Sequence, residues 1–228
     1  MALSDTTIAG RPTESKFLMG IPSDEQQLIL GMAEPLRVSP REMIIRCGDQ
    51  ALALFLLREG NVKYYRVTEQ GEEVLLWWLA PGDVFGMATF LANPPGYIGS
   101  AEATNNCTLW AWEHSSIRRL ASVYPQLSEN ALRITLDYLA AYVDRHAGIT
   151  TRTARQRLAE TLLKLGQRTG RTHPGGIDID ITNEQLGGLA DVGVFTVSRM
   201  LGSWERQGTI AKARGKVRIQ APEKLLTD

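Results

Sequence analysis

The chain has few of the side chains that perform catalysis or bind metal ions. Its 228 residues include only two cysteines and three histidines. Cys47 and Cys107 are far apart and each lies in or beside an apolar, strand-like stretch, so we expect two buried thiols and not a metal-ligand pair. A Ser-His-Asp order, an HExxH motif, a glycine-rich phosphate loop and a paired-carboxylate motif are all missing. The sequence therefore predicts neither an enzyme nor a metal site.

Long apolar runs are also missing. No stretch of about 18 consecutive apolar residues occurs, and the N-terminus has no basic segment followed by an apolar run. We therefore expect a cytoplasmic chain without a membrane segment. Its length exceeds the usual single-domain size of about 100–150 residues, which predicts two domains.

Net charge is lacking over the whole chain, but the charges are unevenly distributed. From Thr151 onward there are 13 Lys and Arg against 8 Asp and Glu, whereas residues 1–150 carry 12 and 17. An excess of positive charge in one part of a chain is typical of a segment that binds a polyanion such as DNA.

The N-terminal half has the pattern of a β domain. Ser23 is expected to cap a short helix, and from Leu36 to Trp112 short apolar or alternating runs are broken by turn signals at intervals of about 8–12 residues. This spacing predicts a barrel or a sandwich.

One long helix is predicted after Pro125, because neither Gly nor Pro recurs before Gly148. One apolar stripe is expected to cover the barrel: Leu127, Ala131, Ile134, Tyr138 and Ala141. A second is suited to a partner helix: Leu132, Thr135, Leu139, Tyr142, His146 and Ile149. Two apolar faces on one helix favour a homodimer.

The last third carries the motif that predicts function. A helix over Thr153–Gly166, a loop over Arg168–Gly176 and a strand over Ile177–Ile181 precede a helix-turn-helix between Thr182 and Gln207. Thr182 and Gln185 form a capping box, and Gly193 is expected to allow the tight turn. The inward face of the motif is predicted to comprise Leu186, Leu189, Val197, Leu201 and Trp204.

That arrangement leaves Phe195, Thr196, Ser198 and Arg199 on the outward N-terminal part of the second helix, where a recognition helix meets base edges. Arg199 is expected to bind guanine, and Phe195 a thymine methyl group. The hairpin over Thr209–Gln220 resembles a basic wing whose phosphate contacts are expected from Lys212, Arg214 and Lys216. Together with Thr182, these residues form the predicted DNA-binding surface.

The order of barrel strands, long helix and helix-turn-helix resembles the CRP/FNR superfamily of bacterial transcription regulators over about Phe17 to Ile219. The segments that carry the resemblance are Gly60-Asn61-Val62-Lys63, Leu79-Ala80-Pro81-Gly82-Asp83-Val84-Phe85-Gly86 and Thr196-Val197-Ser198-Arg199. The resemblance implies an α+β fold with three parts. These are a cyclic-nucleotide-binding-like sensor barrel of double-stranded β-helix (jelly-roll) type over 1–123, a dimerisation helix over 124–150 and a winged helix-turn-helix over 151–228.

The resemblance also implies a mode of action. A homodimer would place two recognition helices on half-sites about 34–36 Å apart in near-palindromic double-stranded DNA. Such a protein activates or represses transcription, often by contacting RNA polymerase, under the control of a signal sensed by the barrel. The recognition helix departs from the family, because Phe195 stands where many members have Glu and Val194 where several have Arg.

The barrel departs from cyclic-AMP-binding members at the nucleotide site. Gly86 is retained, but Met87 replaces a Glu, and Tyr97-Ile98 replace an Arg-Ser pair. No cation remains to pair with a cyclic phosphate, so cyclic AMP is not the expected effector. With Tyr142 at the position that approaches the adenine, these residues are expected to line either a pocket for a small apolar effector or haem, or a core that binds nothing.

Three further interpretations concern the signal and the function. An oxygen-sensing iron–sulfur cluster is excluded because no cysteine precedes Cys47. Haem-dependent sensing of nitric oxide remains an alternative, with His114 or His146 as the axial ligand, although a helix start explains the first and packing explains the second. A dimeric interaction module that does not bind DNA is the other alternative.

Overall fold

The computed structural model describes residues 15–226, which form two compact units. The first comprises the chain up to Tyr64 together with Leu79–Tyr138, and the second comprises Tyr65–Trp78 together with the chain from Leu139 onward. Within the described residues, no helix has both the length and the apolar content that a membrane span requires.

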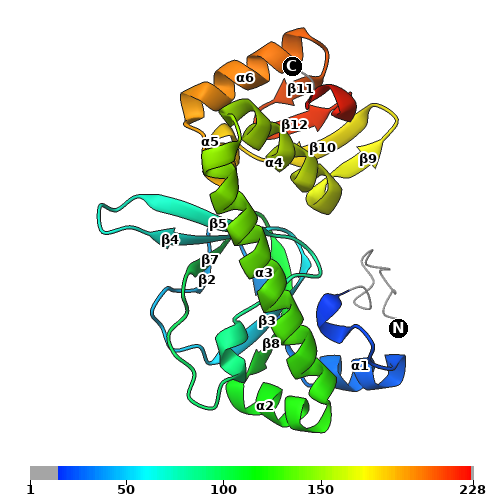
Figure 1. Cartoon of the computed structure of the whole chain (residues 1–228). Helices are drawn as coiled ribbons and strands as arrows, with labels where there is room; N and C mark the ends of the chain where they lie inside the picture. Colours follow the sequence, from blue (N-terminus) through cyan, green and yellow to red (C-terminus); the bar gives the residue numbers. More distant parts are fainter. Residues whose placement is uncertain (1–14, 227–228) are drawn as a thin grey trace. The chain divides into compact units, whose positions relative to one another are not determined.

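Two four-stranded sheets form a jelly-roll barrel, which confirms the predicted fold class (Figure 1). The strand orders are β1-β8-β3-β6 and β2-β7-β4-β5. The strands are β1 (Glu34–Val38), β2 (Met43–Ile45), β3 (Ala53–Glu59), β4 (Val62–Val67), β5 (Glu73–Leu79), β6 (Val84–Phe85), β7 (Ser100–Ala103) and β8 (Cys107–Glu113). β3 pairs antiparallel with both β6 and β8.

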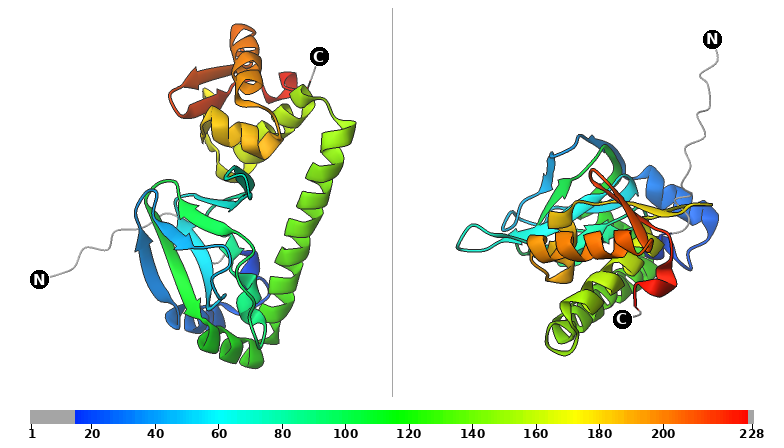
Figure 2. Two further views of the ribbon diagram at one scale, coloured as in Figure 1. Left: turned by 90° about the vertical axis from the view of Figure 1, so that its left-hand side faces the viewer. Right: turned by 90° about the horizontal axis from the view of Figure 1, so that it is seen from above.

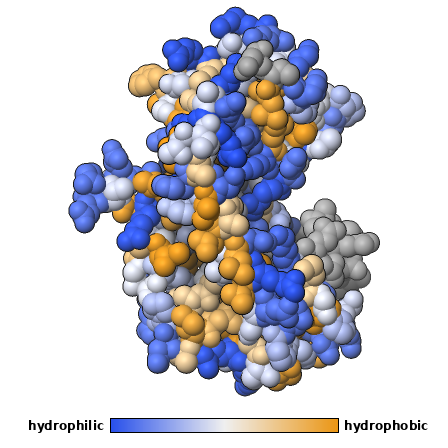
Figure 3. Space-filling model, in the orientation of Figure 1, coloured by the Kyte–Doolittle hydropathy of each residue, from blue (hydrophilic) through white to orange (hydrophobic). Residues whose placement is uncertain are grey.

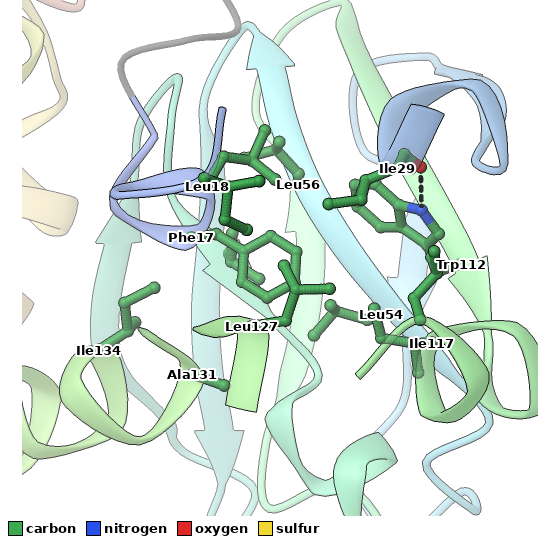
Figure 4. Close-up of a cluster of buried hydrophobic side chains, with 13 residues drawn as sticks. Phe17, Leu18, Ile29, Leu54, Leu56, Trp112, Ile117, Leu127, Ala131 and Ile134 are labelled. Carbon is green, nitrogen blue, oxygen red and sulfur yellow. Dashed lines mark hydrogen bonds between the residues drawn. The ribbon is translucent and has the colours of Figure 1, made fainter. Parts of the chain in front are cut away.

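Alternation along the strands places one set of side chains in a buried cluster. Leu54 and Leu56 of β3 meet Trp112 of β8 there (Figure 4). The Trp112 indole N–H donates to the Ile29 carbonyl oxygen at 2.9 Å, which satisfies its polar atom inside the apolar core. Ile29 belongs to α1 (Ser23–Gly31), whose N-cap is Pro22 and carries no side-chain cap, so the prediction that Ser23 caps this helix is wrong.

The long helix is confirmed as α3 (Pro125–Thr151), which is continuous in the left view of Figure 2. It follows α2 (His114–Val123). Leu127, Ala131 and Ile134 are buried in the same cluster as β3 and β8, as the first stripe predicts. Tyr138 continues this stripe and donates its hydroxyl proton to the Val84 carbonyl oxygen at 3.0 Å.

The second unit contains the remaining helices and a third sheet. The helices are α4 (Ala154–Thr169), α5 (Asn183–Ala190) and α6 (Val194–Arg206). The sheet has the order β11-β12-β10-β9, with β9 (Arg171–His173), β10 (Gly176–Asp180), β11 (Ile210–Ala213) and β12 (Lys216–Ile219). The predicted loop over Arg168–Gly176 is therefore wrong, because α4 continues to Thr169 and β9 follows it.

Of the two thiols predicted to be buried, one prediction is corrected. Cys47 lies just beyond β2 and is exposed, whereas Cys107 is buried as expected. Cys47 follows the buried Ile45 by two residues but lies outside the strand, so the alternation of the strand does not fix its direction.

Candidate nucleic-acid interface

The helix-turn-helix begins with the predicted capping box. The Gln185 backbone N–H donates to the Thr182 side-chain oxygen at 3.2 Å, and the Thr182 backbone N–H donates to the Gln185 side-chain oxygen at 2.9 Å. These two bonds satisfy donors that the first turn of α5 would otherwise leave without partners. Thr182 is exposed, so the same residue fixes the start of α5 and remains on the surface of the motif.

The turn between the helices uses a different residue from the one predicted. Asp191, the C-cap of α5, has the positive φ of 51°, whereas Gly193 has φ −59° and serves as the N-cap of α6. Aspartate tolerates the left-handed region better than most residues. Gly187 is also required, because a Cβ there would lie 2.6 Å from the Val192 carbonyl oxygen.

The recognition helix α6 has a fully buried inner face. Val197, Leu201 and Trp204 have no solvent exposure, as the sequence predicts. Because a helix turns 100° per residue, this burial fixes which side chains face outward. At the N-terminal end Phe195 is 90% exposed, Ser198 and Arg199 are exposed, and Thr196 is half-buried.

Arg199 is equipped to read a base. Within residues 15–226 its guanidinium makes no hydrogen bond or ion pair, so its donors are available to an acceptor outside the chain. Phe195 presents only apolar surface, next to the 44% exposed Val194. The reading end of α6 therefore combines one cation with two apolar side chains.

The predicted wing is the β11–β12 hairpin, but its cations differ in their surroundings. Lys212 pairs with Glu205 at 2.9 Å. Lys216 lies 3.9 Å from an Asp178 oxygen and 3.6 Å from an Asp180 oxygen. Arg214, at the tip beside Gly215, is exposed and has no such partner among the residues described.

Asp178 is the centre of the charge cluster under the wing. Arg218 donates to it from Nε at 2.6 Å and from Nη2 at 3.2 Å, and His173 lies 3.2 Å away. These hydrogen bonds, the one from Arg218 first, hold the pKa of the Asp178 carboxyl well below its usual range. The carboxylate is therefore ionised at neutral pH and opposes part of the positive charge of the hairpin.

The residues predicted to line an effector pocket have different surroundings. Ile98 is 72% exposed. Met87 is partly buried and packs against the core cluster. Tyr142 belongs to the second unit, where it lines a separate cavity with Trp77 of β5. Gly86 is needed for backbone reasons, because φ is +89° and a Cβ would lie 2.5 Å from the Ala53 carbonyl oxygen.

Tyr97 is bonded into the barrel wall. Its hydroxyl donates to the Ala53 carbonyl oxygen at 2.9 Å and accepts from the Ala53 N–H at 3.1 Å. The Thr89 hydroxyl, completely buried, donates to the Ala51 and Ala53 carbonyl oxygens at 3.0 and 2.9 Å. Burial raises the pKa of Tyr97, so the hydroxyl keeps its proton at neutral pH. The polar groups at the start of β3 are thus satisfied by the protein itself.

Haem does not fit the residues present. Two cavities of the described residues measure about 140 and 190 Å³ and have neither histidine nor cysteine in their linings. Small-molecule sites usually need about 300 Å³ or more. His114 Nδ1 lies 2.8 Å from the Thr89 carbonyl oxygen, and His146 lies on an exposed face of α3. Over residues 15–226, no group of three His, Cys, Asp or Glu side chains is placed to hold a metal ion.

Comparison with known protein families gives two matches that together cover most of the chain. Residues 35–124 match the family model described as a cyclic nucleotide-binding domain. Residues 156–227 match the model described as a Crp-like helix-turn-helix domain. The second match includes α5, α6 and the β11–β12 hairpin.

Individual proteins show the same likeness. The cAMP-activated global transcriptional regulator CRP of Pasteurella multocida is 30% identical over 187 residues, which cover 77% of this chain and 84% of that protein. The fumarate and nitrate reduction regulatory protein of Escherichia coli K12 is 24% identical over 85% of this chain and 76% of its own. The solved structure of FixK2 from Bradyrhizobium japonicum superposes with a TM-score of 0.74 at 22% identity, over 85% of this chain and 95% of that one.

Proposed function

Because this chain belongs to the CRP/FNR superfamily of DNA-binding transcription regulators, we propose that it acts as a homodimer on near-palindromic double-stranded DNA. In this proposal α6 enters the major groove with its N-terminal end toward the bases. The observation that carries the proposal is the partition of α6 into a fully buried inner face and an exposed end that presents Phe195, Ser198 and Arg199.

Dimerisation through α3 supplies the second recognition helix. Leu132, Leu136, Leu139 and Val143 are each 53–60% exposed, and apolar surface follows α3 in Figure 3. Their spacing of four, three and four residues is that of a coiled-coil seam. The predicted row shares Leu132 and Leu139 with this one and continues through Tyr142 and Ile149, which are 54% and 44% exposed. An unpaired apolar row on a long helix is the surface that a second copy of the helix would cover.

Control by an effector belongs to the same proposal. Met87 and the internally bonded Tyr97 disfavour cyclic AMP in the barrel, because neither supplies a cation for the cyclic phosphate. The effector is therefore of another class. A DNA target implies action in the cytoplasm, and a contact with RNA polymerase would explain activation.

The decisive experiment is a binding selection from a library of randomised palindromes. For the wild-type chain we expect a guanine in each half-site. Arg199→Ala should abolish that preference, a loss of about 1–3 kcal/mol per half-site, because a bidentate arginine contact distinguishes guanine from other bases by this amount.

Arg214→Ala is the matched control, since it removes an arginine from the wing and not from the reading helix. It should weaken binding to all sequences alike and leave the selected palindrome unchanged. Retention of the guanine preference by Arg199→Ala would contradict the assignment of α6. Absence of selective DNA binding by the wild-type chain would favour the interaction-module alternative.

A further inference from the structure

The turn between α5 and α6 depends on a residue whose backbone conformation needs support. Asp191, the C-cap of α5, has φ 51° and ψ 50°, in the left-handed region. Residues other than glycine are uncommon there, although aspartate is tolerated better than most. Only Val192 and Gly193 lie between Asp191 and the first residue of α6. The direction in which α6 leaves α5 therefore depends on how firmly Asp191 is held.

The carboxylate of Asp191 is held from α3. Arg145 donates from Nε to Oδ2 of Asp191 at 2.9 Å. The two side chains are 22% and 29% exposed, so the pair is largely shielded from water. A hydrogen bond between two charged groups is shorter and stronger than one between neutral groups. Among residues 15–226, Arg145 is the only side chain that bonds to this carboxylate.

The backbone of the same turn is held from α4. Arg157 donates from Nε to the Ala190 carbonyl oxygen at 3.0 Å and from Nη2 to the Asp191 carbonyl oxygen at 2.9 Å. The end of a helix leaves such carbonyl groups without partners inside the helix, and its dipole favours a cation there. Arg157 therefore caps α5 and bonds only to backbone atoms at this turn.

Arg145 has a second set of partners, on β5. It donates from Nη1 to the Leu75 and Leu76 carbonyl oxygens at 3.0 and 3.3 Å. The same strand lies close to α5, because a Cβ on Gly188 would be 3.3 Å from the Leu75 Cβ. All of these residues belong to the second unit. One guanidinium group thus joins α3, β5 and the turn that precedes the reading helix.

We propose that Arg145 is a positioning residue for DNA reading. By holding Asp191 it sets the direction of α6, and by bonding to Leu75 and Leu76 it makes that direction depend on β5. A set of binding groups must be held within about 0.5 Å of its working geometry, so a loose turn would misplace Arg199 at its base. This role rests on the proposed function, whereas the hold on the turn is a property of the free chain.

The hold on the turn is tested without DNA, by hydrogen exchange of single backbone amides followed by nuclear magnetic resonance. The Val192 N–H donates to the Gly187 carbonyl oxygen at 3.0 Å across the turn. Arg145→Met keeps the length of the side chain and removes its donors. It should speed exchange at Val192 about tenfold or more, since a lost charged hydrogen bond eases local opening. Amides in the middle of α4 should keep their rates. Unchanged exchange at Val192 would overturn the proposal.

The effect on DNA reading is measured as two affinities, one for the selected palindrome and one for a non-specific duplex. Arg145→Met should weaken binding to the palindrome about tenfold or more, the value of a misplaced bidentate contact. Its non-specific affinity and salt slope should equal those of the wild type, because Arg145 bonds to protein groups and not to phosphate. A residue that only stabilises the fold would not separate the two affinities. Equal losses, or no loss for the palindrome, would refute the positioning role.

A double-mutant cycle shows whether Arg145 acts through the reading end of α6. In the background of Arg199→Ala, the main contact that Arg145 is proposed to position is already gone. The effect of Arg145→Met on the palindrome should then fall to about threefold or less, since residues that act through one contact are not additive. A full tenfold effect in that background would contradict the proposed route.

Substitutions of Asp191 test the same bond from its other side. Asp191→Asn keeps a side-chain oxygen that accepts from Arg145 and a residue that tolerates the left-handed region, so it should keep most of the selectivity. Asp191→Gly takes the same backbone conformation without strain and removes the carboxylate. It should lose selectivity as Arg145→Met does, and it replaces that variant should Arg145→Met fail to fold. Full selectivity in a folded Asp191→Gly protein would refute the proposal.

Arg152→Met is the matched control. Arg152 follows α3 and pairs with Asp144 at 3.0 Å and Glu160 at 3.2 Å, away from the turn and from β5. This variant should match the wild type both in exchange at Val192 and in DNA selectivity. A wild-type chain that prefers no palindrome over a non-specific duplex would count against the proposed function. Exchange at Val192 would then still decide whether Arg145 holds the turn.

Discussion

At the scale of single residues, Phe195 is a large aromatic side chain that lies almost wholly in solvent. It is 90% exposed at the start of α6, where it gains nothing from folding. We predict that it contacts a thymine methyl group in each half-site. Phe195→Ala should then lower DNA affinity by about 0.8 kcal/mol or more per half-site, the value of one buried methylene-sized group.

Uracil substitution provides the measurement, because it removes only the methyl group of the base. In the wild-type protein, replacement of the contacted thymine by uracil should weaken binding by about fourfold. In Phe195→Ala the same replacement should have no effect, since the partner of the methyl group is gone. An equal loss in both proteins would show that Phe195 does not touch this methyl group.

Other residues show what a sequence can and cannot predict. The partners of the Thr182 capping box lie three residues apart, so this pair could be predicted correctly. The positive φ of the turn falls on Asp191 and not on Gly193, and local sequence did not reveal this. Arg145, 46 residues earlier, holds the Asp191 carboxylate at 2.9 Å. A contact between residues so far apart leaves no local pattern.

At the scale of elements, the wing hairpin is predicted to bind phosphate unevenly. Arg214 at its tip has no acidic partner among the described residues, whereas Lys216 lies near Asp178 and Asp180 of β10. Arg214→Ala should therefore reduce the slope of log affinity against log salt by about 0.9, the value for one phosphate contact. Lys216→Ala should reduce it by less than half as much.

Asp180→Asn tests the cause of this difference. The substitution removes the negative charge that lies near Lys216. The same carboxylate pairs with Arg171 at 2.7 Å, so the charge of Arg171 is released as well. The expected result is a steeper salt dependence than that of the wild type, measured by fluorescence anisotropy on a non-specific duplex. Equal slopes for the Arg214 and Lys216 variants would show that the carboxylates of β10 do not screen the wing.

Elements with strong periodicity could be predicted, and those formed by distant pairing could not. α3, α5 and α6 follow from apolar spacing, caps and glycines within their own sequence. β9 has three residues, Arg171 to His173, with no alternating apolar pattern. It is a strand because β10 pairs with it antiparallel. The spacing of the turn signals predicted a barrel or a sandwich. The order of the strands in its two sheets could be known only from the structure.

At the scale of the whole molecule, the residues of the predicted effector pocket come from distant parts of the chain. The residues proposed from the family resemblance lie in two different units, and Tyr97 is satisfied by the backbone of β3. A cavity of the second unit is likewise lined by Leu76–Trp78 and by residues more than 60 positions later, from Ala141 to Ala190. No spacing rule connects such positions.

The assembly of two copies is the remaining property of the whole molecule, and α3 makes it testable. Leu136→Lys places a charge in the middle of the exposed apolar row, where two copies would meet at a coiled-coil seam. We expect this variant to sediment as a monomer under conditions in which the wild type is a dimer. Leu28→Lys is the matched control, because Leu28 on α1 is 62% exposed and lies outside that row.

The monomeric variant and the dimeric wild type should also differ in DNA binding. In the dimer, binding of one half-site presents the second recognition helix to the other half-site at a high effective concentration. Leu136→Lys should therefore lose about 100-fold or more in affinity for the full palindrome, while its affinity for a single half-site stays that of the wild type. A monomer that keeps full affinity for the palindrome would contradict the dimeric mode of binding. A Leu136→Lys protein that remains a dimer would place the dimer contact on another surface.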